Sequence, residues 1–84
     1  MKFVYQPQGV CSRQIDIELG EDGVIQEVLF TGGCSGNAQG VAALVKGMPA
    51  EDAIRRIKGI RCGFKMTSCP DQLALALEEA LEEL

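Results

Sequence analysis

The sequence predicts an α+β domain in which a small three-stranded antiparallel sheet is followed by three helices packed on one of its faces. Up to Thr31, apolar and polar residues alternate with a period of two, which is typical of strands. From about Asn37 onward, apolar residues recur every three or four positions, which is typical of helices. A length of 84 residues with 46% hydrophobic residues fits one small globular domain. We therefore expect a single domain over residues 1–84, with the sheet in 1–31 and the helices in 37–84.

The first part of the chain contains the candidate strands. A short aromatic and β-branched run, 2–6, ends at Pro7. The alternation over 13–19 puts three apolar side chains on one face and three polar ones on the other: Ile15, Ile17 and Leu19 against Gln14, Asp16 and Glu18. The segment 20–23 reads as a hairpin turn with a glycine at each end.

The return strand is expected over 24–31, with apolar residues on both of its faces. One face carries Val24, Val28 and Phe30, and the other carries Ile25 and Leu29. A strand with apolar residues on both faces is typical of a buried position in a sheet, so we expect this strand to be more buried than its hairpin partner.

The remaining chain contains three candidate helices. The first presents Val41, Leu44, Val45 and Met48 at helical spacing and ends at Gly47. The second begins at Pro49, carries Ala53, Ile54 and Ile57, and ends near Gly59. The third begins near Pro70 and has one apolar stripe, made of Leu73, Leu77, Ala80, Leu81 and Leu84.

The net charge and the short apolar runs disfavour nucleic-acid and membrane partners. Eight basic against twelve acidic residues give a net charge of −4, which makes attraction of the whole surface to nucleic acid or to an anionic membrane unfavourable. Apolar runs are far shorter than the roughly 20 residues that span a bilayer, and residues 1–7 lack the apolar core of a signal peptide. We expect a cytoplasmic protein with no membrane or nucleic-acid partner.

The cysteines are the most informative residues, because there are four of them and no histidine. A reducing compartment disfavours disulfides and leaves metal binding, redox chemistry or buried inert thiols. The absence of histidine excludes Cys–His nucleophilic catalysis, and we expect no catalytic residue in this chain alone.

The positions of the cysteines favour a metal site. Each lies in a loop or at the end of a predicted element rather than inside one: Cys11, Cys34, Cys62 and Cys69. Loop ends beside glycines allow the backbone to aim ligands, as a four-ligand site requires. The spacing matches no Cys-x-x-Cys zinc ribbon, so the prediction depends on placement. We expect these four to bind zinc or an iron–sulfur cluster.

Local electrostatics favour thiolates at two of the cysteines. If Pro70 is the first helical residue, Cys69 is the N-cap and faces free backbone N–H groups, and Cys34 also precedes a helix start. An acid-free basic run follows in the second helix and its loop: Arg55, Arg56, Lys58, Arg61 and Lys65. This run is either a solvated face, a source of thiolate stabilisation or a docking patch for an anion such as a nucleotide phosphate. The glycine-rich segment 32–37 is either a phosphate cradle or a tight turn that presents Cys34.

The stretch Thr67-Ser68-Cys69-Pro70-Asp71 resembles the signature that names the TSCPD domain family. The resemblance continues upstream through the segments 9–12, 33–37, 46–48 and 59–63 and covers nearly the whole chain. That family occurs as small free-standing proteins and as a C-terminal module of adenosylcobalamin-dependent ribonucleotide reductases. The resemblance thus implies a link to ribonucleotide reduction and deoxyribonucleotide synthesis, although this chain is too short to be the catalytic subunit.

A weaker resemblance is to the U-type iron–sulfur scaffold proteins. They also run strands first, then a Gly-Cys turn into a helix ending Lys-Gly, and later a cysteine that opens a terminal helix. Cys11, Cys34 and Cys69 match their three cluster or zinc ligands. Ser12-Arg13 departs from the Gly-Asp of that pattern, and Cys62 is additional. A fourth sulfur in place of the carboxylate would suit structural zinc or a retained cluster better than cluster transfer.

The leading hypothesis is an accessory metal-binding module with a protein partner, for which a ribonucleotide reductase is the candidate. The alternatives are a dithiol redox protein that uses Cys62 and Cys69, an iron–sulfur scaffold, and a plain interaction domain with buried thiols. The metal, the partner and the oligomeric state are not determined by the sequence.

Overall fold

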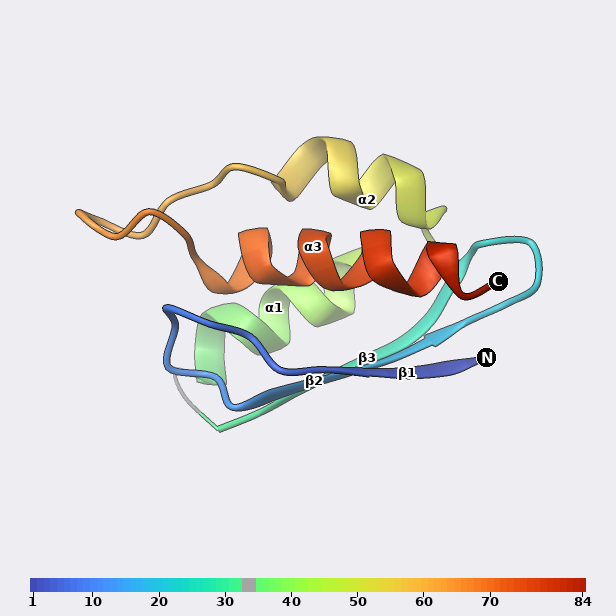
Figure 1. The fold of residues 1–84 in the computed structure, drawn as a ribbon, viewed down its shortest axis with the longest axis horizontal. Helices are drawn as coiled ribbons and strands as arrows, with labels where there is room; N and C mark the ends of the chain where they lie inside the picture. The colour runs from blue at the N-terminus through green and yellow to red at the C-terminus, as the bar shows by residue number, and fades with distance from the viewer. Residues whose placement is uncertain (33–34) are drawn as a thin grey trace.

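The computed structural model describes residues 1–32 and 35–84, and the side chain of Ser35 is not described. Over these residues the chain forms strands β1 (Lys2–Tyr5), β2 (Gln14–Leu19) and β3 (Ile25–Thr31), then helices α1 (Ser35–Val45), α2 (Ala50–Ile57) and α3 (Cys69–Glu82). The strands form one antiparallel sheet in the order β1-β2-β3. The helices lie on one side of this sheet (Figure 1), so the predicted α+β class is confirmed.

Strand β2 lies in the middle of the sheet and follows its predicted alternation. Ile15, Ile17 and Leu19 are buried beneath the helices, and the intervening polar residues are partly exposed on the opposite face. A central strand covered on one face gains from burying alternate side chains, at about 25 cal/mol per Å² of apolar surface. The sequence pattern and the packing agree here because every second residue of β2 faces the core.

Strand β3 departs from the predicted pattern because of a β-bulge. Glu18 pairs with Glu27, but the next residue of β2, Leu19, pairs with Ile25, so Gln26 is an extra residue in β3. The bulge brings Ile25 and Val28 to the same buried face, although three residues separate them. Leu29 then faces away from the core and is 59% exposed. The prediction that Val28 and Phe30 lie opposite Leu29 is confirmed, whereas Ile25 was predicted to share a face with Leu29 and instead lies on the buried face.

The prediction that β3 is more buried than its partner is also wrong. β3 is an edge strand, and four of its seven residues are exposed. Helix α1 packs against this strand and covers Ile25 and Val28 from one side. Phe30 packs beside the same core, whereas the other face of the sheet, which lies away from the helices (Figure 1), keeps Glu27 and Leu29 in water.

Helix α1 begins earlier and faces differently than the apolar spacing predicts. It starts at Ser35, before the expected boundary at 37, and its buried residues are Ala38 and Val45, with Val41 and Ala42 packed beside them. Leu44, which was expected on the inner face, is 78% exposed. The small alanine side chains let the helix lie close to β3, and Leu44 then falls on the opposite side. Gly47, at φ +88°, follows the helix end as expected.

Helices α2 and α3 pack on each other and complete the core. Pro49 is the N-cap of α2 and Gly59, at φ +90°, follows its last turn, as the sequence predicts. The apolar stripe of α3 is confirmed at Leu73, Leu77 and Ala80, which are fully buried, whereas Leu84 lies beyond the helix and is exposed. In the described part of the chain, no helix is both long enough and apolar enough to cross a bilayer.

Candidate functional site

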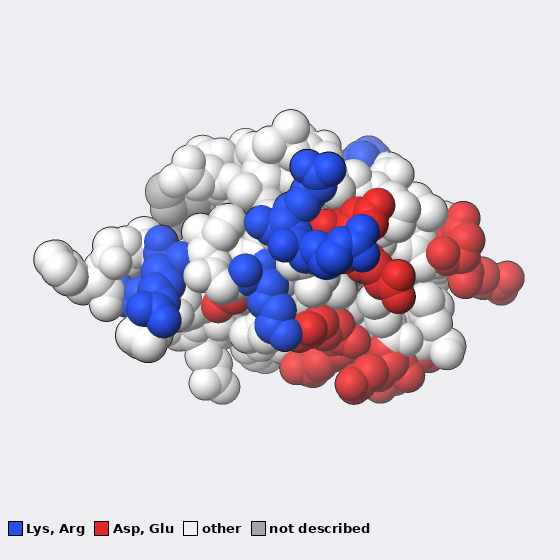
Figure 2. All heavy atoms as spheres, turned by 90° about the horizontal axis from the view of Figure 1, so that it is seen from above, with Lys and Arg blue, Asp and Glu red and all other residues white. Residues whose placement is uncertain are grey.

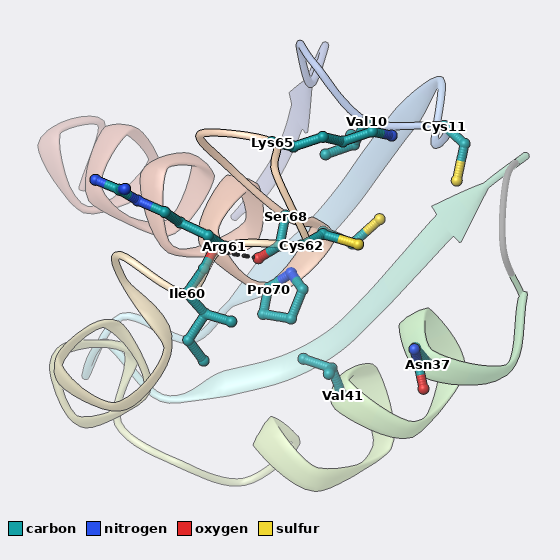
Figure 3. A pocket seen from close by; sticks show the side chains of 11 residues that line it. Val10, Cys11, Asn37, Val41, Ile60, Arg61, Cys62, Lys65, Ser68 and Pro70 are labelled. Carbon is teal, nitrogen blue, oxygen red and sulfur yellow. Dashed lines mark hydrogen bonds between the residues drawn. The ribbon is translucent and has the colours of Figure 1, made fainter.

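Cysteines from three separate segments line one cavity of about 300 Å³. Cys11 comes from the β1–β2 loop and Cys62 from the α2–α3 loop (Figure 3), and Cys69 lies in the first turn of α3. Apolar side chains form much of the remaining wall: Val10, Val41, Ile60 and Pro70. Three of the four predicted site residues therefore lie around the same cavity, although they are far apart in the sequence.

The fourth predicted residue, Cys34, lies outside the described residues. Helix α1 begins directly after it, and Asn37 and Val41 of that helix line the cavity. Within residues 1–32 and 35–84, no three cysteine, aspartate or glutamate side chains lie close enough together to hold a metal ion. The convergence of all four sulfurs therefore stays a prediction. Cys62 and Cys69 carry free thiols.

The start of α3 differs from the prediction in the identity of its cap. The N-cap is Ser68 rather than Cys69, and the Ser68 hydroxyl accepts the backbone N–H of Asp71 at 3.2 Å. A hydroxyl oxygen is a stronger acceptor than a thiol sulfur, which is why serine is preferred at this position. Ser-x-x-Asp at 68–71 has the spacing of a capping box, a signal in the sequence that identifies this cap.

Cys69 is instead the first residue of the helix, and its sulfur contacts the β1–β2 loop. Its Sγ lies 3.2 Å from the hydroxyl oxygen of Ser12, which is 3% exposed. Ser12 follows Cys11 directly, so one short segment supplies both a thiol to the cavity wall and a buried hydroxyl to the sulfur of Cys69. Sequence reasoning did not identify Ser12, and only its position beside Cys11 could have suggested it.

Two polar side chains tie the α2–α3 loop to the start of α3. The Ser68 hydroxyl donates to the carbonyl oxygen of Ile60 at 2.6 Å. The Asp71 carboxylate accepts the Gly59 N–H at 2.7 Å and also the hydroxyl of Thr67. Both ends of the loop are thus anchored to the first turn of α3, and the loop that carries Cys62 has a defined position.

Gln72 connects the same helix turn to the first strand. Its side-chain oxygen accepts the Gln8 N–H at 3.0 Å and the Tyr5 hydroxyl at 3.4 Å, and its amide donates to Thr67 at 2.9 Å. Burial raises the pKa of Tyr5, and the negative charges of Glu79 and Asp71 add to this. Gln72 therefore positions the segment 5–8, which leads directly to Cys11.

The basic run divides into paired and unpaired cations. Arg55 forms an ion pair with Asp52, and Lys58 forms one with Glu78, all on exposed surface. Arg61 and Lys65 line the cavity. In Figure 3 the Lys65 side chain extends toward Val10 and Cys11, whereas Arg61 points away from the thiols. Lys65 is therefore the cation of this run that the fold brings to the thiol side of the cavity.

Taken together, the fold and the cavity define a small α+β protein with a thiol-lined pocket at the helix start that follows its longest loop. The family model of the TSCPD domain matches residues 3–81. The chain belongs to the TSCPD domain family, as its signature at 67–71 predicts. Searches of curated proteins and of solved structures gave no match. The resemblance to U-type scaffold proteins stays a likeness of sequence pattern.

Proposed function

We propose that this protein is an accessory metal-binding module in which Cys11, Cys34, Cys62 and Cys69 hold one zinc ion or one iron–sulfur cluster. The observation that carries the proposal is that three cysteines from separate segments line one cavity. The fourth directly precedes the helix whose first two turns line the same cavity. Thiolates are the preferred ligands of both candidate metals.

Metal binding would require the thiols to move closer together, since no three ligands among the described residues are within reach of one ion. Cys11 and Cys62 lie in exposed loops, where such a movement disturbs no core packing. Cys69 is on the first turn of a well-packed helix and would be the fixed point of the site. Cys34 would supply the ligand that completes it.

The surroundings of the cavity suit a site with excess negative charge. Four thiolates carry more negative charge than one Zn²⁺ ion neutralises, and the Lys65 ammonium lies on the thiol side of the cavity. The Ser12 hydroxyl can donate to the sulfur of Cys69 in its thiolate form. Outer groups of this kind orient and stabilise metal ligands.

The resemblance to modules of ribonucleotide reductases supports a role beside such an enzyme in deoxyribonucleotide synthesis. Within this proposal the module acts by binding a partner protein. Within this proposal, the basic loop also offers Arg61 and Lys65 to a nucleotide phosphate.

The first experiment is metal analysis of protein purified without oxygen. One zinc per chain identifies a structural zinc site, and a brown sample with iron and sulfide identifies a cluster. Protein that contains neither, and takes up neither on reconstitution, would overturn the proposal.

The second experiment links the metal to stability. A structural metal contributes about 10 kcal/mol, whereas the core of a domain this small supplies only about 3–5 kcal/mol. Cys34→Ser and Cys69→Ser should therefore release the metal and lower the melting temperature sharply, and a strong chelator should do the same to the unsubstituted protein. Asn37→Ala is the matched control, because Asn37 lines the cavity and offers no sulfur.

The alternative function is that of a dithiol redox protein. It is favoured by the presence of two free thiols, Cys62 and Cys69, on the same cavity. In this reaction the two thiols would reduce a disulfide of a partner protein, so that a Cys62–Cys69 disulfide forms and the partner gains two thiols. Unchanged melting of both serine variants and of chelator-treated protein, together with loss of disulfide exchange, would select this alternative.

A further inference from the structure

The loop between α2 and α3 presents apolar side chains to water at one end of the molecule. Phe64 is fully exposed, Met66 is 73% exposed and Ile60 is 44% exposed. The loop projects beyond the helices at the end opposite the chain termini (Figure 1). Exposed aromatic and methionine side chains gathered in one place are typical of protein interaction sites. Packing against the described residues leaves these side chains largely in water.

The loop is held in this projecting form by its own hydrogen bonds. The N–H of Lys65 donates to the carbonyl of Cys62 at 3.0 Å, and the N–H of Cys62 donates to the carbonyl of Thr67 at 3.1 Å. These bonds close a tight turn with Phe64 near its tip, and Gly63 adopts a φ of +59° within it. A pre-ordered turn loses little conformational entropy when it binds, which favours a docking role.

The cations beside Phe64 define the charge that its partner must carry. Arg61 and Lys65 lie in the same loop as Phe64, and neither forms an ion pair with any residue of the described ranges. A partner surface with an apolar pocket and a rim of carboxylates would match this tip in both respects. Two copies of the tip facing each other would bring like charges together.

The opposite end of the same molecule has the required surface. A cavity of about 260 Å³ lies between the β2–β3 turn, the start of α2 and the end of α3. Leu81, Leu84, Pro49 and Ala50 supply apolar lining, and Glu21, Asp22 and Glu51 supply carboxylates. Figure 2 shows acidic side chains from the middle of the molecule toward this end, and basic side chains over the middle and at the loop end.

We propose that the Phe64 tip of one molecule docks in this acidic cavity of a second copy, forming a head-to-tail contact. Phe64 would enter the apolar lining, and Arg61 and Lys65 would meet Glu21 and Glu51. One loop tip against one small cavity is a contact at the low end of interface size, so the association is weak and reversible. The proposal goes beyond the metal site and does not depend on it.

The first test is the mass of the purified protein by analytical ultracentrifugation over a concentration series at low salt. The average mass should rise as the protein concentration approaches the millimolar range, and it should fall again when added salt screens the charges. Phe64→Ser should weaken the association at least tenfold. Leu44→Ser is the matched control, because Leu44 is another exposed apolar residue on a different face, and its loss should change nothing.

The second test distinguishes a head-to-tail contact from any symmetric one. The Phe64 tip is the head of this contact and the acidic cavity is its tail. Phe64→Ser inactivates the head, and the double variant Glu21→Lys/Glu51→Lys inactivates the tail. Each variant alone should stay monomeric, but their mixture should form dimers and nothing larger, because only one head and one tail remain functional.

Four results would overturn the proposal. One is a protein that stays monomeric throughout the concentration series. Another is self-association that Phe64→Ser leaves unchanged, or a mixture of the two variants that forms no dimer. The last is flotation of monomeric protein with phosphatidylserine-containing vesicles in a Phe64-dependent manner, which would assign the tip to a lipid surface instead.

Discussion

Two consecutive segments of this chain depart from the usual distribution in opposite ways, because one buries polar side chains and the other exposes apolar ones. In 67–72, the polar side chains of Ser68 and Gln72 are buried and hydrogen-bonded. In 60–66, directly before, the apolar side chains of Phe64 and Met66 are in water. The usual distribution of polar and apolar residues is therefore inverted across one boundary.

The difference shows that hydrogen bonding, rather than hydrophobic burial, positions the loop. Ser68 and Asp71 bind backbone groups at Ile60 and Gly59, so the loop is held at its base by the polar segment. A buried polar group is tolerated when all of its hydrogen bonds are made, and every buried side-chain nitrogen and oxygen of the described residues has a partner. The apolar tip is then free to act outside the domain. The following predictions test whether the buried polar segment 67–72 stabilises the domain and the exposed tip does not.

Among the substitutions that remove these hydrogen bonds, the largest effect is expected for Gln72→Ala. This substitution removes the partner of the Gln8 N–H, the Tyr5 hydroxyl and the Thr67 hydroxyl at once. We expect a loss of about 2–3 kcal/mol in the free energy of unfolding, measured by urea denaturation. Gln39→Ala on the exposed face of α1 is the matched control and should change stability little. Equal effects of the two substitutions would show that the buried network contributes no stability.

A smaller loss is expected for Ser68→Ala, which removes the cap of α3 and the bond to Ile60. We expect about 1–2 kcal/mol by the same denaturation method. Ser68→Thr keeps the hydroxyl and should recover most of this loss. A loop positioned by Ser68 should also become more accessible to proteases in the alanine variant. Unchanged cleavage within 59–67 would contradict that role.

Titration of Tyr5 tests the hydrogen bonds of Gln72 where they reach strand β1. Tyr5 is the single tyrosine and there is no tryptophan, so ultraviolet absorbance reports its phenolate directly. Burial, with Glu79 and Asp71 adding to it, raises the pKa of Tyr5 above its ordinary value of 10.0 in the folded protein. The neutral phenol is thus favoured by folding.

This group's contribution to stability is present below the pKa of the unfolded chain and is lost as pH rises through the higher folded value. We therefore expect a phenolate midpoint above that of the urea-unfolded protein, and a weaker pH dependence of stability in Tyr5→Phe. A folded midpoint equal to or below the unfolded one would contradict the burial of this hydroxyl.

The smallest effect on stability is expected for Phe64→Ser. The side chain makes no buried contact, so the free energy of unfolding should change by less than about 0.5 kcal/mol. Leu73→Ala in the core, by contrast, should lose about 2–5 kcal/mol. A strongly destabilised Phe64→Ser protein would show that the tip packs on its own domain rather than on a partner.

The elements that could be predicted from the sequence are those whose pattern depends on local geometry. In β2, alternation follows from the two-residue period of any strand, and Ile15, Ile17 and Leu19 are buried as expected. In α3, Leu73 and Leu77 share one face of any helix. The turn glycines at 23, 47 and 59 have positive φ, a conformation that glycine adopts without strain.

The candidate site could be predicted only in part. The loop positions of Cys11, Cys62 and Cys69 suggested convergence, and these three line one cavity. Ser12 and Cys69 are in contact although they are 57 positions apart in the sequence, and no local sequence pattern predicts a contact over that separation. The orientations of Lys65 and Arg61 likewise depend on how the loop turn is closed.

The sequence by itself determined the class of fold, the order of its elements, the start of α2 at Pro49 and the family. The tertiary structure decided which side chains meet: the bulge that buries Ile25 with Val28, the choice of Ala38 over Leu44 for the inner face of α1, and the two cavities at opposite ends. The physical reason is the separation along the chain over which each kind of interaction acts. Backbone periodicity and capping act within a few residues, whereas packing against a sheet and the closing of a cavity depend on residues brought together from distant parts of the chain.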